Sequence, residues 1–340
     1  MEQLPTSMKT VRQLDPHSTT LTLDPATPVP ETNEEYTHLL QVKATSPCLG
    51  ELHWAAFFPD PTRERSPGTE ASAIVVASPP DSPFQPGVEV FYRMFVGPTG
   101  LPVPGCLREY TTARQDTLAR KPRNLSWEEA ATVPLSALTA WQGLFDHGTL
   151  DGAALTDGSS EARAGNAKVR VLITGASGGV GLWLVQLAAA AGAGSIIALC
   201  HPSKADAVRA RGATEIVPYT TQTITAWADS HEPVDLVVDT VGGQILDSTW
   251  AAIRTGGTIL TIAPSGGVKR PAGVTKEVAK AEWYLVESRG SELEQIAKLL
   301  EEGKVSPNLD SVFDFEDYEA AFEKVQSRKT TGKVAIRVSV

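Results

Sequence analysis

Cysteine, positive charge and long apolar runs are all scarce in this sequence. Its three cysteines, Cys48, Cys106 and Cys200, lie far apart and form no Cys-x-x-Cys pair. This usage is typical of a reducing compartment and argues against a disulfide framework and against a zinc site built from thiolates. No apolar run approaches the roughly 18 residues that a membrane-spanning helix needs. The first residues lack the apolar core of a secretory signal, so we expect a soluble, cytoplasmic protein.

The balance of charge is acidic. The chain has 40 Asp and Glu residues against 30 Lys and Arg, which gives a net charge of −10, and no basic patch is evident. Nucleic acid and anionic membranes are therefore not expected as partners, and a small molecule is the expected substrate. With 340 residues, 41% of them hydrophobic and 21% charged, the chain is expected to form two ordinary globular domains.

Residues 169–193 carry the strongest functional signal. A β-branched apolar run at 169–174 indicates a buried parallel strand, and a turn of small residues, GASGGVG, follows at 175–181. Apolar residues at helical spacing then continue to Gly192, which can end a helix. In this order, free N–H groups and the positive end of the helix dipole face a pyrophosphate that small residues allow to approach. The sequence therefore predicts a dinucleotide site; the alternative is a tight turn that binds nothing.

The rest of the chain divides into segments that differ in their predicted secondary structure. Short β-branched runs between proline and glycine clusters predict an irregular barrel up to about residue 135. From residue 169 onward strands and helices alternate, which predicts a doubly wound parallel sheet. The C-terminal piece has a capping box at Ser291 and Glu294 and a closing strand at 333–340, and we expect it to fold back onto the first domain. Residues 151–166 are small, polar and aperiodic, so we expect a mobile surface insertion.

This order of parts, with several short strings, resembles the medium-chain dehydrogenase/reductase superfamily, and most of all its zinc-independent quinone oxidoreductase and enoyl reductase branch. The resemblance implies an α/β fold with a GroES-like β-barrel domain at 1–137, a Rossmann doubly wound parallel sheet at 138–288, and a return segment at 289–340 that completes the first domain. It also implies a homodimer. The string from Cys48 to Trp54 resembles fungal members, many of which serve secondary metabolism. The other matching strings are GTEA at 68–71, WEEAATVP at 127–134, LTAW at 138–141, GASGGVG at 175–181, DTVGG at 239–243 and GGT at 256–258.

The resemblance also allows a prediction about catalytic zinc. In zinc-dependent relatives a Cys, a His and a second Cys or an acid hold the ion. Cys48 falls on the first position, but Thr69 falls on the second. The third lies in the segment from Ser136 to Trp141, which offers no thiolate, imidazole or carboxylate. We therefore expect no catalytic zinc.

The choice of nicotinamide cofactor follows from the end of the second Rossmann strand. NAD enzymes place an acid there, and this chain has none. Lys204, Tyr219 and Arg328 instead fall on the family's positions that bind a 2′-phosphate, so NADPH is expected. The cofactor contacts that the resemblance implies are Thr139, Ser177, Gly178, Gly179, Val180, Cys200, Ser203, Lys204, Tyr219, Val241, Ile262, Ala263 and Arg328.

Hydride transfer to a quinone or an enone places negative charge on a carbonyl oxygen, so the protein must position the acceptor carbon and supply a donor. Thr139 matches a family threonine beside the nicotinamide. His53, Tyr92 and Tyr110 are candidate donors from the barrel domain; the alternatives are a structural histidine and core tyrosines, with water or the cofactor ribose delivering the proton. The candidate catalytic residues are thus His53, Tyr92 and Thr139, and the candidate substrate pocket is Cys48, Glu51, His53 and Tyr92.

Cys48 and Glu51 stand where quinone oxidoreductases commonly have Asn and Asp, which leaves the substrate class open. The leading hypothesis is an NADPH-dependent reductase that transfers hydride to an activated C=C bond or a quinone. One alternative is a non-catalytic NADPH-binding sensor or scaffold. Another is a pathway enzyme that reduces an aldehyde or catalyses a rearrangement on the same fold.

Overall fold

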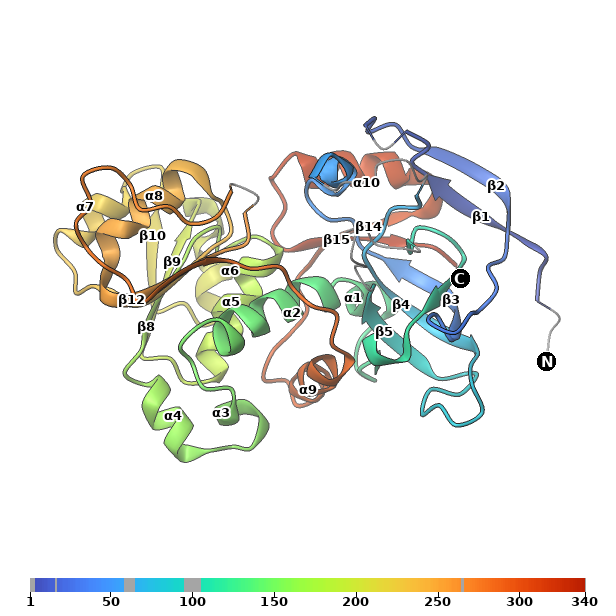
Figure 1. Cartoon of the computed structure of the whole chain (residues 1–340), viewed down its shortest axis with the longest axis horizontal. Coiled ribbons are helices and arrows are strands. Elements are labelled where there is room, and N and C mark those ends of the chain that lie inside the picture. Colours follow the sequence, from blue (N-terminus) through green and yellow to red (C-terminus); the bar gives the residue numbers. More distant parts are fainter. Residues whose placement is uncertain (1–3, 16, 58–64, 95–104, 264–265, 340) are drawn as a thin grey trace. The chain divides into compact units, whose positions relative to one another are not determined.

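The computed structural model describes residues 4–15, 17–57, 65–94, 105–263 and 266–339, and Figure 1 shows their arrangement along the chain. The chain divides into two compact units. Unit 1 contains Met1–Leu138 and Glu287–Val340, and unit 2 contains Thr139–Val286. The two units are described separately here.

Unit 1 is built on a seven-stranded sheet that joins the first part of the chain to its end. The strand order is β14-β15-β3-β4-β5-β7, with β6 paired to β3; β14 and β15 are parallel and the other pairs are antiparallel. A separate two-stranded sheet pairs β1 with β2. The strands are β1 (Ser7–Arg12), β2 (Thr22–Pro28), β3 (His38–Thr45), β4 (Glu70–Ala77), β5 (Glu89–Arg93), β6 (Tyr110–Ala113), β7 (Leu118–Arg120), β14 (Leu309–Asp314) and β15 (Lys333–Arg337).

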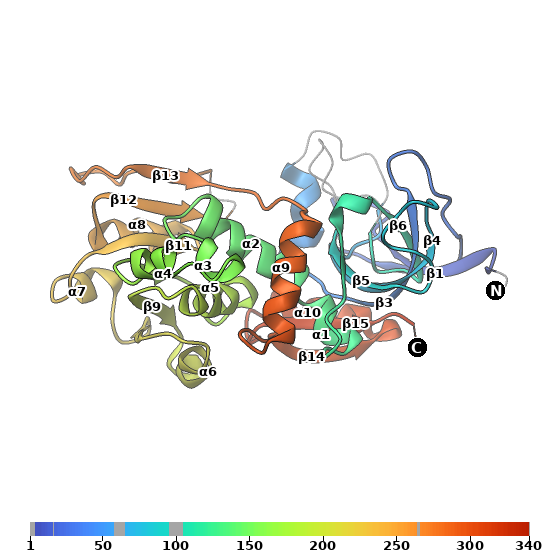
Figure 2. The same cartoon turned by 90° about the horizontal axis from the view of Figure 1, so that it is seen from below.

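Short helices flank this sheet (Figure 2). The capping box of Ser126 and Glu129 forms at the start of α1. The expected box at Ser291 does not form, because the N-cap of α9 is Arg289, two residues earlier, and the helix begins at Gly290. A Cβ on Gly290 would lie 2.2 Å from the Leu118 carbonyl oxygen, so close packing on β7 sets this start. The helices are the 3₁₀-helix η1 (Glu51–Phe57), α1 (Trp127–Ala131), α9 (Gly290–Glu301) and α10 (Tyr318–Gln326), with short 3₁₀ turns at η2 (Gln115–Thr117) and η5 (Phe315–Asp317).

Unit 2 is a six-stranded parallel sheet in the order β10-β9-β8-β11-β12-β13. The chain runs outward from β8 in one direction and from β11 in the other, so the switch point lies between these two strands. The doubly wound sheet beside a largely antiparallel barrel-type unit confirms the expected α/β fold class. The strands are β8 (Arg170–Ile173), β9 (Ser195–Cys200), β10 (Glu215–Pro218), β11 (Val234–Asp239), β12 (Ile253–Thr261) and β13 (Lys280–Trp283).

Helices cover both faces of this sheet, and Figure 1 shows α7 and α8 on one side and α5 on the other. Ile224, Trp227, Leu246 and Trp250 pack α7 and α8 onto the strands. The helix α2 contains the boundary between the two units and continues directly into η3, a π-helix. The helices are α2 (Pro134–Trp141), η3 (Gln142–Asp146), α3 (Ala153–Thr156), α4 (Ser160–Asn166), α5 (Gly179–Ala190), α6 (Ala205–Ala210), α7 (Ile224–Ala228) and α8 (Gly243–Ala252), with a 3₁₀ turn at η4 (Pro202–Lys204).

The expectation of a mobile insertion at residues 151–166 is wrong. This segment forms α3 and α4 and is anchored by Asn166, whose side chain is buried. The Asn166 amide donates to the carbonyls of Asp151 (3.0 Å) and Ala191 (2.9 Å), at the C-terminal end of α5. Its oxygen accepts from the Asp151 amide (2.8 Å). The sequence hid these helices because they are short and their packed face consists of alanines, which give no apolar period.

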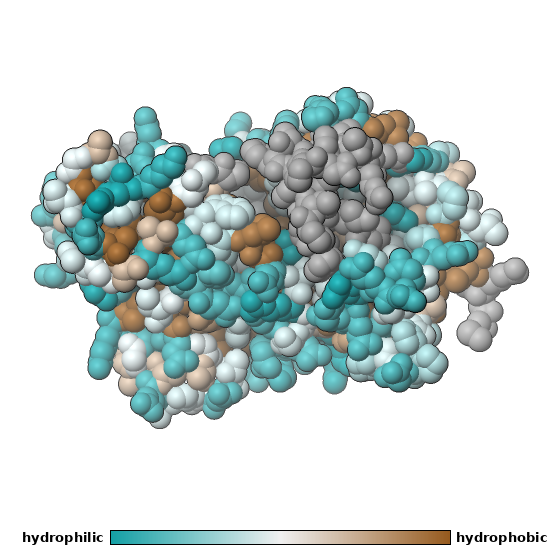
Figure 3. All heavy atoms as spheres, in the orientation of Figure 1, coloured by the Kyte–Doolittle hydropathy of each residue, from teal (hydrophilic) through white to brown (hydrophobic). Residues whose placement is uncertain are grey.

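On the face that Figure 3 shows, the apolar residues that are coloured brown are scattered among polar ones. Such scattered exposure is ordinary for globular proteins. In the part of the chain that the structure describes, no helix has the length and apolar character to cross a bilayer.

Candidate functional site

The glycine turn of unit 2 connects β8 to the N-terminus of α5. Gly175 adopts a left-handed conformation (φ +59°), and a Cβ there would lie 2.3 Å from the Thr240 hydroxyl. A Cβ on Gly181 would lie 2.2 Å from the Gly175 carbonyl oxygen, so both positions require glycine. Gly178 is the N-cap of α5, and no side chain caps the helix there. The turn therefore leaves backbone amides at a helix N-terminus for an anion.

Asp239 ties together the strand ends beside this turn. It is fully buried at the last position of β11. The hydroxyls of Thr174 (2.6 Å) and Thr261 (2.7 Å) donate to its carboxylate, and so does the amide of Gly242 (2.8 Å). These bonds link the ends of β8, β11 and β12 around the switch point, where ligands of such sheets bind. The sequence contained Asp239 within a matching string, but nothing in that string revealed its role as the shared acceptor.

The predicted nicotinamide contacts of unit 2 lie along these strand ends. Val241 is exposed directly after β11, and Ile262 and Ala263 follow β12. The Ile262 amide donates to the Asp239 carbonyl (3.1 Å), and the Ala263 amide donates to the Thr261 hydroxyl (3.1 Å). Thr139 is buried in the last turn of α2.

The predicted phosphate contacts follow β9 and β10. Cys200 ends β9, where burial raises the pKa of its thiol, and Ser203 and Lys204 lie on η4. Tyr219 follows β10 and is exposed, and its ring meets that of His201 edge to face, with the two ring centroids 5.9 Å apart. The carboxyl ends of parallel strands share one edge of a sheet, so the predicted residues that follow β9, β10, β11 and β12 lie along one edge.

Arg328 lies in unit 1, after the end of α10. It is the one non-glycine residue among those described that has a positive φ (+56°). A side chain in this conformation costs free energy that a glycine would avoid, which is compatible with a role for the guanidinium. Its contact with the cofactor stays a prediction.

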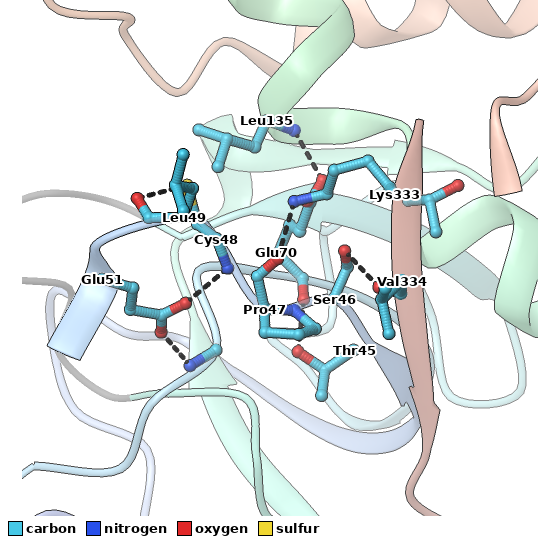
Figure 4. A network of polar contacts seen from close by, with 12 residues as sticks. Thr45, Ser46, Pro47, Cys48, Leu49, Glu51, Glu70, Leu135, Lys333 and Val334 are labelled. Atoms are coloured by element: carbon cyan, nitrogen blue, oxygen red, sulfur yellow. Dashed lines mark hydrogen bonds and ion pairs between the residues drawn. The ribbon is translucent and has the colours of Figure 1, made fainter. Parts of the chain in front are cut away.

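Unit 1 holds a buried network of charged side chains (Figure 4). The Lys333 ammonium lies 2.8 Å from Glu70 Oε1 and donates to the Pro47 carbonyl (3.0 Å). The second oxygen of Glu70 accepts from the Leu135 amide (2.7 Å) at the start of α2. Both charged side chains are buried. Burial opposes the charge of Lys333, but the attraction of Glu70 together with contributions from Cys48 and Glu51 outweighs it and raises the lysine pKa.

Glu51 is a second buried acidic side chain of unit 1 that holds the backbone through hydrogen bonds. It accepts from the amides of Cys48 (2.8 Å) and Gly68 and has no exposed surface. Burial raises the pKa of the Glu51 carboxyl, although the two amide bonds work in the opposite direction. Burial also raises the pKa of the neighbouring Cys48 to about 11, so that side chain is a neutral thiol near neutral pH. Glu51 thus acts as a support for the loop that carries Cys48.

The candidate proton donors lie in different surroundings. His53 is exposed on η1. Tyr92 is fully buried in the core of unit 1, its hydroxyl 3.3 Å from Cys106 Sγ, and burial raises its pKa well above 10. These surroundings favour the alternative in which Tyr92 is a core side chain. Tyr110 is half-buried at the start of β6.

The residues of unit 1 do not fit a catalytic zinc ion. Thr69, at the position of the family's histidine, is buried and offers no metal-binding nitrogen. The positive field of the Lys333 ammonium, which acts on Cys48, opposes a second cation. Within the described ranges, no group of three or more His, Cys, Asp or Glu side chains is placed to hold a metal.

Comparison with known proteins identifies the family. A family model described as zinc-binding dehydrogenase matches residues 211–336. A protein from Arthroderma benhamiae, the probable zinc-binding oxidoreductase, mitochondrial, is 39% identical over 338 residues, which cover 98% of each chain. The chain belongs to the medium-chain dehydrogenase/reductase superfamily.

Two further proteins are similar to this chain over about two thirds of its length or more. The NADPH-dependent alkenal/one oxidoreductase, chloroplastic, of Arabidopsis thaliana is 30% identical over 235 residues, covering 68% of this chain and 53% of that protein. The structure of the quinone oxidoreductase from Coxiella burnetii matches with a TM-score of 0.78 at 22% identity, covering 98% of this chain and 100% of that chain. The resemblance to the medium-chain dehydrogenase/reductase superfamily that was stated from the sequence is therefore confirmed.

The expected cytoplasmic location is contradicted by these relatives. The Arthroderma protein is named as mitochondrial and the Arabidopsis protein as chloroplastic. The inference failed because the missing apolar core argues only against secretion. Organelle transit segments are amphipathic and lack that core, so its absence does not distinguish cytoplasm from organelle.

Proposed function

We propose that the protein is an NADPH-dependent, zinc-independent reductase that transfers hydride to an activated C=C bond or a quinone. The glycine turn, whose amides lie beside strand ends tied by Asp239, is the observation that carries this proposal. The names of the Arabidopsis alkenal/one oxidoreductase and the Coxiella quinone oxidoreductase support the acceptor classes.

Different residues of this chain would bind different parts of the cofactor. Backbone amides of Ser177, Gly179 and Val180 would hold the pyrophosphate, and Lys204 and Tyr219 would hold the 2′-phosphate. Thr139, Val241, Ile262 and Ala263 would orient the nicotinamide. NADPH, when bound, supplies the hydride. His53 and Cys48 remain candidates for the substrate side, with water as the alternative proton source, whereas the contacts of Glu51 and Tyr92 favour supporting roles.

A substrate screen tests the proposal directly. The isolated protein would be mixed with NADPH and a panel of enones, enals and quinones, and the absorbance of the reduced nicotinamide would be followed. Oxidation with at least one acceptor class is expected. Tight binding of NADPH with no turnover across the panel would favour the sensor or scaffold alternative.

Replacing Lys204 with alanine tests the choice of cofactor. Charge-assisted hydrogen bonds are worth about 1.5–3 kcal/mol each, so K204A is expected to raise the KM for NADPH about tenfold or more and to leave NADH nearly unaffected. Steady-state kinetics with both cofactors measure this. Lys168→Ala, an exposed lysine of the same unit, is the matched control. Equal losses with NADPH and NADH would refute the phosphate contact.

Metal analysis tests zinc independence, which the names of the relatives put in question. The purified protein is expected to contain far less than one equivalent of zinc and to keep its activity after dialysis against a chelator, since the residues at the zinc position offer too few ligands. Elemental analysis paired with activity assays gives the answer. Stoichiometric zinc whose removal abolishes turnover would contradict the expectation.

A further inference from the structure

A buried tyrosine contacts the backbone of the helix that carries Thr139. The Tyr284 hydroxyl donates to the Thr139 carbonyl (2.9 Å), and the side chain is only 3% exposed. In a regular α-helix the Thr139 carbonyl accepts from the amide four residues later, that of Gly143. Here the hydroxyl of a side chain from the segment that follows β13 reaches this same carbonyl, at the residue proposed to contact the nicotinamide and three residues before the π-helix begins.

The helix widens where the tyrosine enters. Residues Gln142–Asp146 form a π-helix, and the amide of His147 donates to the Gln142 carbonyl five residues earlier (2.9 Å). A Cβ on Gly143 would lie 2.3 Å from the Tyr284 hydroxyl oxygen, so glycine makes room for the hydroxyl. Single π-turns inside helices arise where a group inserts into the hydrogen-bond ladder, and they occur often at functional sites.

The same segment holds the far end of the π-turn. The rings of His147 and Tyr284 stack with centroids 4.7 Å apart and planes inclined by 25°. Lys280, on β13, donates to the His147 carbonyl (3.0 Å) and pairs with Glu282 (2.7 Å), which in turn lies 3.3 Å from the His147 ring nitrogen. The stretch from Lys280 to Tyr284 therefore fixes both the start and the end of the widened turn.

We propose that Tyr284 is a positioning residue for cofactor binding, which sets the backbone of Thr139 through the π-turn. This rests on the proposed function, in which Thr139 orients the nicotinamide. Loss of the hydroxyl would let the helix close toward regular α geometry and rotate Thr139 away from its position. The ring itself would stay stacked on His147, so the effect would come from the single hydrogen bond.

Replacing Tyr284 with phenylalanine tests this role. Removal of one hydrogen bond that holds the contact is expected to weaken NADPH and NADH by the same factor, about fivefold, and so to leave the preference between them unchanged. It is also expected to increase the deuterium isotope effect with C4-deuterated NADPH, because a misplaced nicotinamide slows hydride transfer. Calorimetry of cofactor binding and steady-state kinetics supply both readouts.

Gly143→Ala provides an independent second variant. Its new Cβ would collide with the hydroxyl and displace it, so we expect the same pattern as in Y284F. Since both changes act on one contact, the double variant should bind cofactor no more weakly than G143A alone. Additive losses would show that the two residues act separately and would overturn the proposal.

Tyr318→Phe is the matched control, a buried tyrosine of unit 1 with a hydrogen bond to the Leu23 backbone. It should leave cofactor affinity and the isotope effect unchanged. If Y284F lowers only thermal stability or the yield of active protein, with affinity and isotope effect as in the wild type, Tyr284 is merely structural and the proposal fails. Wild-type protein that binds neither cofactor would overturn the proposed function as well, so the two failures are distinguishable.

Discussion

Replacing Lys333 with methionine is expected to lower the free energy of unfolding by about 3–5 kcal/mol, because it leaves a buried carboxylate without its partner. Methionine keeps the aliphatic stem but removes the ammonium that lies 2.8 Å from Glu70. Glu70 has no exposed surface and would retain the Leu135 amide as a donor. Urea unfolding followed by circular dichroism measures the loss.

The pH dependence has a definite sign. The raised pKa of Lys333 means that the wild-type contribution is present below the unfolded lysine pKa and is lost as pH rises through the folded value. The stability deficit of K333M relative to wild type should therefore shrink as pH rises through the folded pKa of Lys333, because the wild-type protein then loses the same ammonium charge.

A double variant separates the unpaired charge from lost packing. Glu70→Gln together with Lys333→Met removes both charges, and the glutamine oxygen can still accept from the Leu135 amide. We expect this variant to be more stable than K333M alone. If K333M unfolds within about 1 kcal/mol of wild type, which is the scale of a surface ion pair, the buried pair does not hold unit 1 together.

Local signals predicted the Rossmann unit well. The central strands β8, β9 and β11 are largely apolar, and glycines follow the ends of α5 and α6. Gly192 ends α5 with φ +84°, as its position predicted, and Gly212 has φ +108° after α6. Each of these features depends on only a few neighbouring residues, so a single sequence is enough to predict it.

Two edge strands were not predicted, because their sequences lack a clear local signal. β13 has the sequence KAEW and β14 has LDSVFD, both partly exposed and of mixed polarity. A strand at or near a sheet edge buries little, so its sequence lacks a continuous apolar run. The Thr139–Tyr284 contact was hidden as well, because it joins residues 145 positions apart.

The network of unit 1 shows the same limit. Glu70 and Lys333 come from opposite ends of the chain and meet because β15 pairs with β3, which pairs with β4. Nothing near either residue indicates the other. The resemblance located Cys48 and Glu51 near the substrate, whereas only the hydrogen bonds show that Glu51 serves the backbone.

Replacing Gly178 with leucine is expected to weaken NADPH binding about 100-fold or more while the protein stays folded. Gly178 has φ −79° and ψ 175°, a conformation open to any residue, and a Cβ would meet only the Gly175 carbonyl oxygen at 3.3 Å. The backbone conformation therefore does not require glycine here, and a side chain requires the Gly175 carbonyl to shift by only a few tenths of an ångström. The added side chain would instead occupy the approach to the amides of the helix N-terminus, and loss of two charge-assisted bonds accounts for about 3–6 kcal/mol. Calorimetric titration with NADPH, beside a thermal melt, measures both quantities.

Two other glycines give the controls. Gly165→Leu adds the same side chain in α4 of the same unit, where nothing lies within 4 Å, and should change neither quantity. Gly181→Ala should show the reverse pattern to Gly178→Leu, with lower stability, because its Cβ would lie 2.2 Å from the Gly175 oxygen and 2.6 Å from the Ala176 Cα. Should Gly178→Leu lose its fold, Gly178→Ala repeats the test with a smaller group. Wild-type affinity in a folded Gly178 variant would mean that no pyrophosphate rests on this turn, because a ligand held by these amides could not tolerate a side chain among them.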